Sequence, residues 1–97
     1  MKTIKVIFRI DTTKEFKGEV IAVFPYEVER NGNITIYVHN GQHSSGDYNT
    51  ILNTSRLALP SESESLRHEL VSIGYNLQVI NRRNYSKYLR AYKNNNK

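Results

Sequence analysis

The chain contains the stretch SESESLRHELVSIG at residues 61–74, and this stretch decides the fold class. Ser61 and Glu64 have the spacing of a capping box, the pair of side chains that bonds backbone N–H groups at the start of a helix. Apolar side chains follow at the spacing of one helical face: Leu66, Leu70 and Ile73. Gly74 is the residue type that most readily takes the left-handed conformation at a helix C-terminus. The stretch therefore predicts a helix over about residues 62–73.

Segments rich in alternating apolar residues lie on both sides of this helix. Three precede it, at residues 4–10, 20–24 and 34–38, and one follows it, at residues 77–79. Period two is typical of a strand with one buried face, and the unbroken apolar run at 20–24 is typical of a central strand. This order predicts an α+β fold. We expect a small antiparallel sheet, made of a three-stranded meander plus a fourth strand and covered by one main helix.

Residue types that favour turns and caps mark the connections. Asn31-Gly32 predicts a tight hairpin turn, and Pro25, which has no N–H, predicts that the strand ladder ends or reaches an edge there. Residues 40–46 are polar and glycine-flanked, so we expect a loop. Asp47 is expected to cap a short helix. The apolar side of that helix has three members: Tyr48, Ile51 and Leu52.

The bulk composition limits the class of protein. A chain of 97 residues fills one core, and 38% hydrophobic residues is enough for a modest one. Cysteine is absent, which favours a reducing compartment, so we expect a cytoplasmic location. We find no apolar run of signal-peptide or membrane-span length in the sequence, and expect no membrane partner.

Charge is distributed unevenly along the chain. Residues 1–80 carry eight Lys or Arg and nine Asp or Glu, whereas residues 81–97 carry six Lys or Arg and no acid. We therefore expect a single α+β domain over residues 1–81 and a basic, Tyr-rich C-terminal tail over residues 82–97, partly helical and then frayed. A local excess of positive charge favours contact with polyanions.

The tail has the residue types of a nucleic-acid contact, in which cations bind phosphates and tyrosines stack on unpaired bases. The candidate residues are Arg82, Arg83, Lys87, Arg90, Lys93, Tyr85 and Tyr88. In the alternative interpretation, the tyrosines pack against the domain, and Arg83, Lys87 and Arg90 point outward as a solvated stripe.

The segment at residues 39–47 concentrates reactive side chains. His39, His43 and Asp47 are candidates for binding a transition metal, or for general-base catalysis by one histidine. Gly41 and the preceding strand argue against the helical geometry that would bring the two histidines together, so we interpret the segment as structural. In that interpretation Asp47 caps the helix, and the protein holds no cofactor or metal.

Three segments together resemble a group of small proteins of bacteriophages and mobile elements. They are Gly18–Pro25, His39–His43 followed by Asp47-Tyr48, and Glu69-Leu70 with Ile73-Gly74-Tyr75. The resemblance implies phage or mobile-element origin and carries no established activity. The leading hypothesis is a non-enzymatic binding protein, with nucleic acid as the first candidate ligand. The alternatives are a small metal-dependent hydrolase or nuclease using residues 39–47, and a virion accessory or host-defence-interacting protein.

Overall fold

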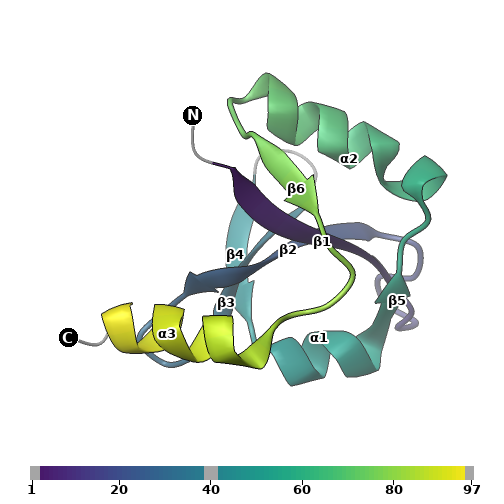
Figure 1. Ribbon diagram of the computed structural model, residues 1–97. Helices are drawn as coiled ribbons and strands as arrows, with labels where there is room; N and C mark the ends of the chain where they lie inside the picture. Colours follow the sequence, from purple (N-terminus) through teal and green to yellow (C-terminus); the bar gives the residue numbers. More distant parts are fainter. Residues whose placement is uncertain (1–2, 39–41, 96–97) are drawn as a thin grey trace.

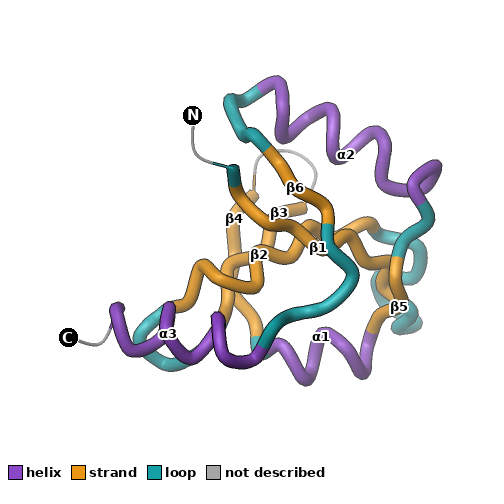
Figure 2. Tube along the Cα trace, in the orientation of Figure 1, coloured by secondary structure: helices purple, strands orange, loops and turns teal. Residues whose placement is uncertain are grey.

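A six-stranded sheet with helices on both faces forms the protein. The computed structural model describes residues 3–38 and 42–95. The elements in chain order are β1 (Ile4–Asp11), β2 (Val20–Val28), β3 (Ile34–Val38), β4 (Gln42–Gly46), α1 (Tyr48–Thr54), β5 (Ser55–Leu57), α2 (Pro60–Ser72), β6 (Leu77–Val79) and α3 (Tyr85–Asn95). Figure 1 and Figure 2 show α2 on one side of the sheet and α1 and α3 on the other. The predicted α+β class is confirmed, but the sheet is covered on two faces rather than one.

The meander is longer than the sequence predicts. β1 to β4 are successive antiparallel neighbours, and β4 is formed by residues 42–46, where we expected a loop. A polar edge strand is stable here because its backbone pairs with β3 while the side chains of residues 43–45 are exposed to water. Residues 40 and 41 of the expected loop lie outside the described residues.

Two short strands share the other edge of β1. β5 pairs antiparallel with Arg9–Asp11, and β6 pairs parallel with Ile4–Val6. The fourth predicted strand therefore exists as β6, but its parallel direction makes the sheet mixed. The chain reaches this direction because α2 carries it back to the start of β1 before β6 begins (Figure 1).

β2 lies at the centre of the sheet, as its apolar run indicates. The ladder between β1 and β2 ends at Val23, before Pro25, as expected, whereas β2 itself continues past the proline. The register between β2 and β3 shifts between Phe24 and Val28, and pairing resumes at Val28 with Ile34. Such an irregularity accommodates the missing N–H of a proline inside a strand. At the turn that follows, Gly32 has a φ of +88°, as a tight hairpin requires.

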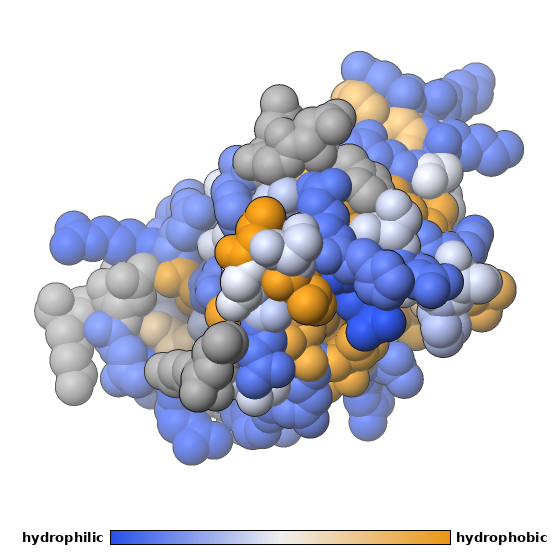
Figure 3. Space-filling model, turned by 90° about the horizontal axis from the view of Figure 1, so that it is seen from above, coloured by the Kyte–Doolittle hydropathy of each residue, from blue (hydrophilic) through white to orange (hydrophobic). Residues whose placement is uncertain are grey.

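Two cores lie on opposite faces of the sheet, although the chain length predicts only one. We call them the α2-side core and the α3-side core. The α2-side core contains Val6, Phe8, Ala22, Phe24, Tyr37, Leu66 and Leu70. The α3-side core contains Ile7, Val23, Val28, Ile34, Tyr48 and Ile51. β1 is consequently buried on both faces, although its alternation predicts only one. Figure 3, seen from the α2 side, shows hydrophobic patches within a largely hydrophilic surface.

Arg9 is a buried cation on the α3-side face of β1. Its Nε donates to Ser55 Oγ at 2.6 Å and its Nη2 donates to the Ser55 carbonyl at 2.8 Å. Burial lowers the pKa of Arg9. The partner oxygens lie at the C-terminal end of α1, where the helix dipole favours a positive charge. This arrangement ties β1 to the junction of α1 and β5.

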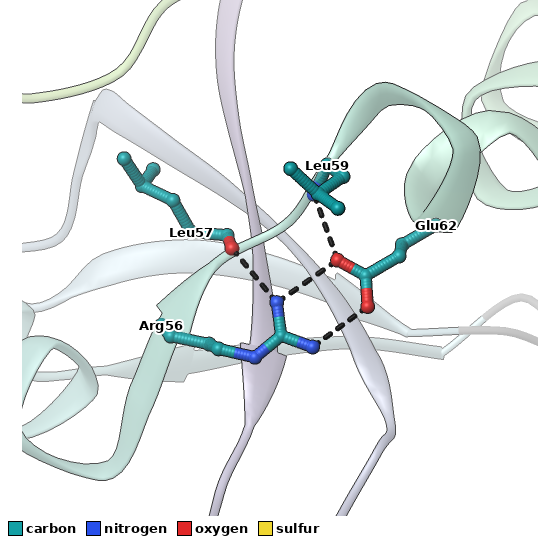
Figure 4. Close-up of polar contacts among 4 residues, drawn as sticks. All are labelled: Arg56, Leu57, Leu59 and Glu62. Carbon is teal, nitrogen blue, oxygen red and sulfur yellow. Dashed lines mark hydrogen bonds and ion pairs between the residues drawn. The ribbon is translucent and has the colours of Figure 1, made fainter.

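The start of α2 differs from the predicted capping box by two residues. The helix begins at Pro60, and Glu62 Oε1 accepts a hydrogen bond from the Leu59 N–H at 2.8 Å. Proline suits the first helical position because its φ is preset and that N–H would have no helical partner. Arg56 then holds both oxygens of Glu62, at 2.9 and 2.7 Å (Figure 4).

The end of α2 matches the prediction only in part. Gly74 has the predicted positive φ, at +110°. Leu66 and Leu70 are fully buried, whereas Ile73 is 54% exposed. Ile73 is the C-cap residue and has a non-helical backbone conformation, so its side chain does not share the buried face of Leu66 and Leu70.

The Arg56–Glu62 contact gives a pH-dependent contribution to stability. Hydrogen bonding from Arg56, with the Leu59 N–H assisting, lowers the pKa of Glu62 to about 2 from an ordinary value of 4.5. A carboxyl with a lowered folded-state pKa stabilises above its unfolded pKa and loses that effect as the pH falls toward the folded value. We therefore expect the stability difference between wild type and Glu62→Gln to be constant above about pH 5 and to vanish toward pH 2.

Urea unfolding of both proteins across this pH range measures the difference directly. Glu64→Gln is the matched control, since it removes a carboxylate from the same helix and leaves the Arg56–Glu62 pair in place. A difference between wild type and Glu62→Gln that stays constant down to pH 2 would show that the contact does not lower this pKa.

Candidate nucleic-acid interface

The start of α3 is fixed to the sheet and to α1 by tyrosine hydroxyls. The Asn84 N–H donates to Tyr26 Oη at 2.7 Å, and the Arg83 N–H donates to Tyr48 Oη at 3.0 Å. Asn84 also caps the helix, because its Oδ1 accepts from the Lys87 N–H at 3.1 Å. The direction of α3 is therefore set by contacts with two distant elements.

The tyrosines of α3 divide into packed and exposed rings. Tyr88 and Tyr92 pack against the α3-side core together with Ala91. The Tyr88 hydroxyl also donates to the Gly32 carbonyl at 2.7 Å. Tyr85 is 61% exposed and stacks on Tyr88 with 5.8 Å between ring centroids. Of the two tyrosines predicted to contact nucleic acid, Tyr88 thus packs against the domain, and Tyr85 presents a ring to solvent.

Arg83 lies between aromatic rings instead of pointing outward. Its Cζ is 4.1 Å from the ring centroid of Tyr48 and 3.9 Å from that of Tyr88. A guanidinium over a ring face is attracted by the ring quadrupole. Arg83 therefore joins α1 to α3, and its charge is partly engaged within the fold.

A groove of about 600 Å³ runs beside α3, and we call it the α3 groove. Lys87 and Arg90 line it from the helix, and Lys5 lines it from β1. Tyr26 forms part of its wall, with Lys5 Nζ 5.9 Å from the ring centroid. The described residues of its lining are Thr3, Ile4, Lys5, Tyr26, Glu27, Lys87, Arg90, Ala91 and Asn94.

The cations of the α3 groove repel one another. Contact with the Lys5 side chain lowers the pKa of Lys87, and the charge of Arg90 acts in the same direction. Glu27 is the one acid among the described lining residues. Burial raises the pKa of Glu27, against an opposing effect of His43. The groove therefore has an excess of positive charge.

The structure brings together some of the predicted contact residues and adds one. Lys87 and Arg90 share the α3 groove, whereas Arg82 and Lys93 are exposed outside its lining. Lys5 was not predicted, because it lies 82 positions before Lys87, among residues 1–80, which together carry no excess of positive charge. Strand alternation is the sequence signal that could have identified Lys5, because it places Lys5 on the same face of β1 as Ile7.

The histidine segment has structural contacts at the positions that the structure describes. Asp47 Oδ2 accepts from the Thr50 N–H and Oγ1, each at 3.1 Å, and so caps α1 as predicted. His43 Nε2 is 2.9 Å from Tyr75 Oη, and the His43 ring meets Tyr37 edge-on at 4.7 Å. His39 lies outside the described residues. Within the described part of the chain, no three His, Cys, Asp or Glu residues are grouped to hold a metal ion.

These features define a class: a small α+β protein with a cation-lined groove beside its C-terminal helix. No protein-family model, curated protein sequence or solved structure matches the chain. The resemblance to phage and mobile-element proteins therefore stays a prediction. Among the described helices, none has the length and apolar character needed to cross a bilayer.

Proposed function

We propose that this protein binds single-stranded nucleic acid along the α3 side of the molecule. The observation that carries the proposal is the gathering of Lys5, Lys87 and Arg90 in one groove. Phosphate contacts from Lys and Arg supply most of the affinity of proteins for nucleic-acid backbones. An anion placed among mutually repelling cations replaces repulsion with attraction, so this arrangement favours a polyanionic ligand.

The exposed ring of Tyr85 favours a single strand over a duplex. Bases stacked within a duplex do not offer their faces to a side chain, whereas unpaired bases stack readily on aromatic rings. Tyr85 lies at the beginning of α3, in the first turn with Lys87. Cations and an exposed ring on one helix are the two components that sequence-tolerant binders of single strands combine.

Tyr85→Ala should weaken the binding of a labelled oligo(dT) strand of about 15 nucleotides by about 1–3 kcal/mol, because one stacking surface is lost. The stability of the Tyr85→Ala variant should change little, since the ring is mostly in water. The measurement is fluorescence anisotropy at two salt concentrations. If three to five phosphates are contacted, the log–log salt slope for wild type should be roughly −2 to −3.5.

Phe16→Ala is the matched control. Phe16 is also an exposed ring, at 51%, and it lies in the β1–β2 connection rather than on α3. Equal losses in Tyr85→Ala and Phe16→Ala would contradict the placement of the ring in the interface. Absence of binding by wild type at low salt would reject the proposed function itself.

A further inference from the structure

Lys5 belongs to the same charged site as α3, although it lies at the opposite end of the chain. Ile7 points into the α3-side core, and strand alternation puts Lys5 on the same face of β1. Lys87 and Arg90 face that position from successive turns of α3. A merely solubilising helix would spread its cations into water, whereas here Lys87 and Arg90 line one groove together with Lys5. The fold thus brings together charges that electrostatics alone would separate.

The walls of the α3 groove are pre-organised. The Tyr26 hydroxyl accepts from the Asn84 N–H, which fixes the ring beside Lys5. Ala91 contributes a small side chain to the lining. A volume of about 600 Å³ lies within the size range of pockets that hold small ligands.

The charge of the groove selects the ligand class. Lys5, Lys87 and Arg90 give three positive charges, and Glu27 is the one described acid in the lining. Arginine and lysine together are the usual partners of phosphate oxygens, the first through its fork of donors and the second as a point charge. The Tyr26 ring offers an apolar face for the sugar or base attached to such a phosphate.

We infer that the α3 groove is a phosphate-binding subsite, in which Lys5, Lys87 and Arg90 surround one phosphate group of a nucleotide that packs against Tyr26. The inference rests on the proposed function and deepens it by locating one phosphate of the bound strand. It also assigns a binding role to Lys5, which lies outside the basic C-terminal segment. Both an internal phosphodiester and a terminal phosphate have the required chemistry.

The first test compares lysines of equal charge in different places. The probes are oligo(dT) strands of about eight nucleotides, one with a 5′-phosphate and one with a 5′-hydroxyl. Lys5→Gln and Lys87→Gln should each weaken binding by about 10- to 100-fold, the usual effect of losing a charged hydrogen-bond partner. The control is Lys17→Gln in the β1–β2 connection, which removes the same charge away from α3 and should cost about threefold or less.

The pattern of losses distinguishes an internal phosphate, a terminal phosphate and the absence of a subsite. A large loss with both strands in Lys5→Gln supports an internal phosphate at the subsite. A large loss with the phosphorylated strand alone supports a terminal phosphate. A loss in Lys5→Gln no greater than that in Lys17→Gln, with wild type still binding both strands, overturns the subsite and leaves the proposed function standing.

The second test does not depend on nucleic acid. The side-chain amine of Lys87 is titrated by NMR in the intact protein, with and without inorganic phosphate. The charged groups that face it are Lys5, Arg90 and Glu27. Bound phosphate should raise the pKa of Lys87, because a nearby anion favours the protonated amine. Lys5→Gln should also raise this pKa in the free protein. An unchanged pKa of Lys87 in phosphate overturns the subsite, even if oligonucleotides bind elsewhere.

Discussion

Leu70→Ala should lower the free energy of unfolding by about 2–5 kcal/mol. Leu70 is fully buried in the α2-side core, where it packs beside Leu66 against the sheet. Removing most of the side chain loses its burial and leaves a cavity that the close-packed surroundings fill only in part. Because small domains have net stabilities of about 5–15 kcal/mol, this single change removes a large fraction of the total.

Ile73→Ala is the control for Leu70→Ala, since it truncates another apolar residue predicted on the same stripe. Ile73 is 54% exposed, so we expect a cost of about 0.5 kcal/mol or less. Chemical denaturation of the two variants gives both values under the same conditions. Similar costs at the two positions would show that α2 does not present Leu70 to the core in the way the structure describes.

Deletion of residues 82–97 should abolish cooperative folding or reduce stability by several kcal/mol. The deletion removes α3, and with it the cover of the α3-side core. It also removes the backbone groups that bond Tyr26 and Tyr48, and the Tyr88 hydroxyl that bonds Gly32. Buried strand residues such as Val23 and Ile34 would lose apolar neighbours.

The expected size of this effect follows from two rings. A fully buried aromatic side chain removes about 150–250 Å² from water. Tyr88 and Tyr92 are partly buried, so we take half of that area for each ring. At about 25 cal/mol per Å², the loss of this burial costs about 4–6 kcal/mol of stability. This amount is comparable to the whole stability of a marginal small domain. Near-UV circular dichroism and urea unfolding of the deleted protein measure the loss.

The control for the deletion keeps the rings and removes the charges. Lys87→Gln, Arg90→Gln and Lys93→Gln in one protein should leave the unfolding midpoint nearly unchanged, because none of these side chains contributes to the α3-side core. If the deleted protein unfolds at the same denaturant concentration as wild type, α3 is not part of the folded unit. If it unfolds earlier, weaker nucleic-acid binding by the deleted protein does not by itself locate the interface.

Local signals in the sequence determined several elements correctly. The Leu66 and Leu70 spacing, the positive φ of Gly74, the hairpin at Gly32 and the Asp47 cap of α1 all appear in the structure. Each depends on residues a few positions apart. Backbone conformation and hydrogen bonding within one turn decide such features, so neighbouring residues contain most of the necessary information.

Tertiary contacts decided the remaining features. Polar residues 42–46 form a strand because their backbone pairs with the edge of β3. At the start of α2, Glu62 rather than Glu64 completes the capping box, because Pro60 and Arg56 favour that position. The same holds for the site. Pairing of β1 with β2 and packing of α3 on the sheet set Lys5 beside Lys87, while the rings of Tyr48 and Tyr88 engaged Arg83. Sequence alone determined which charges the chain carries, but their mutual distances depend on pairings between residues far apart, and no local pattern encodes those pairings.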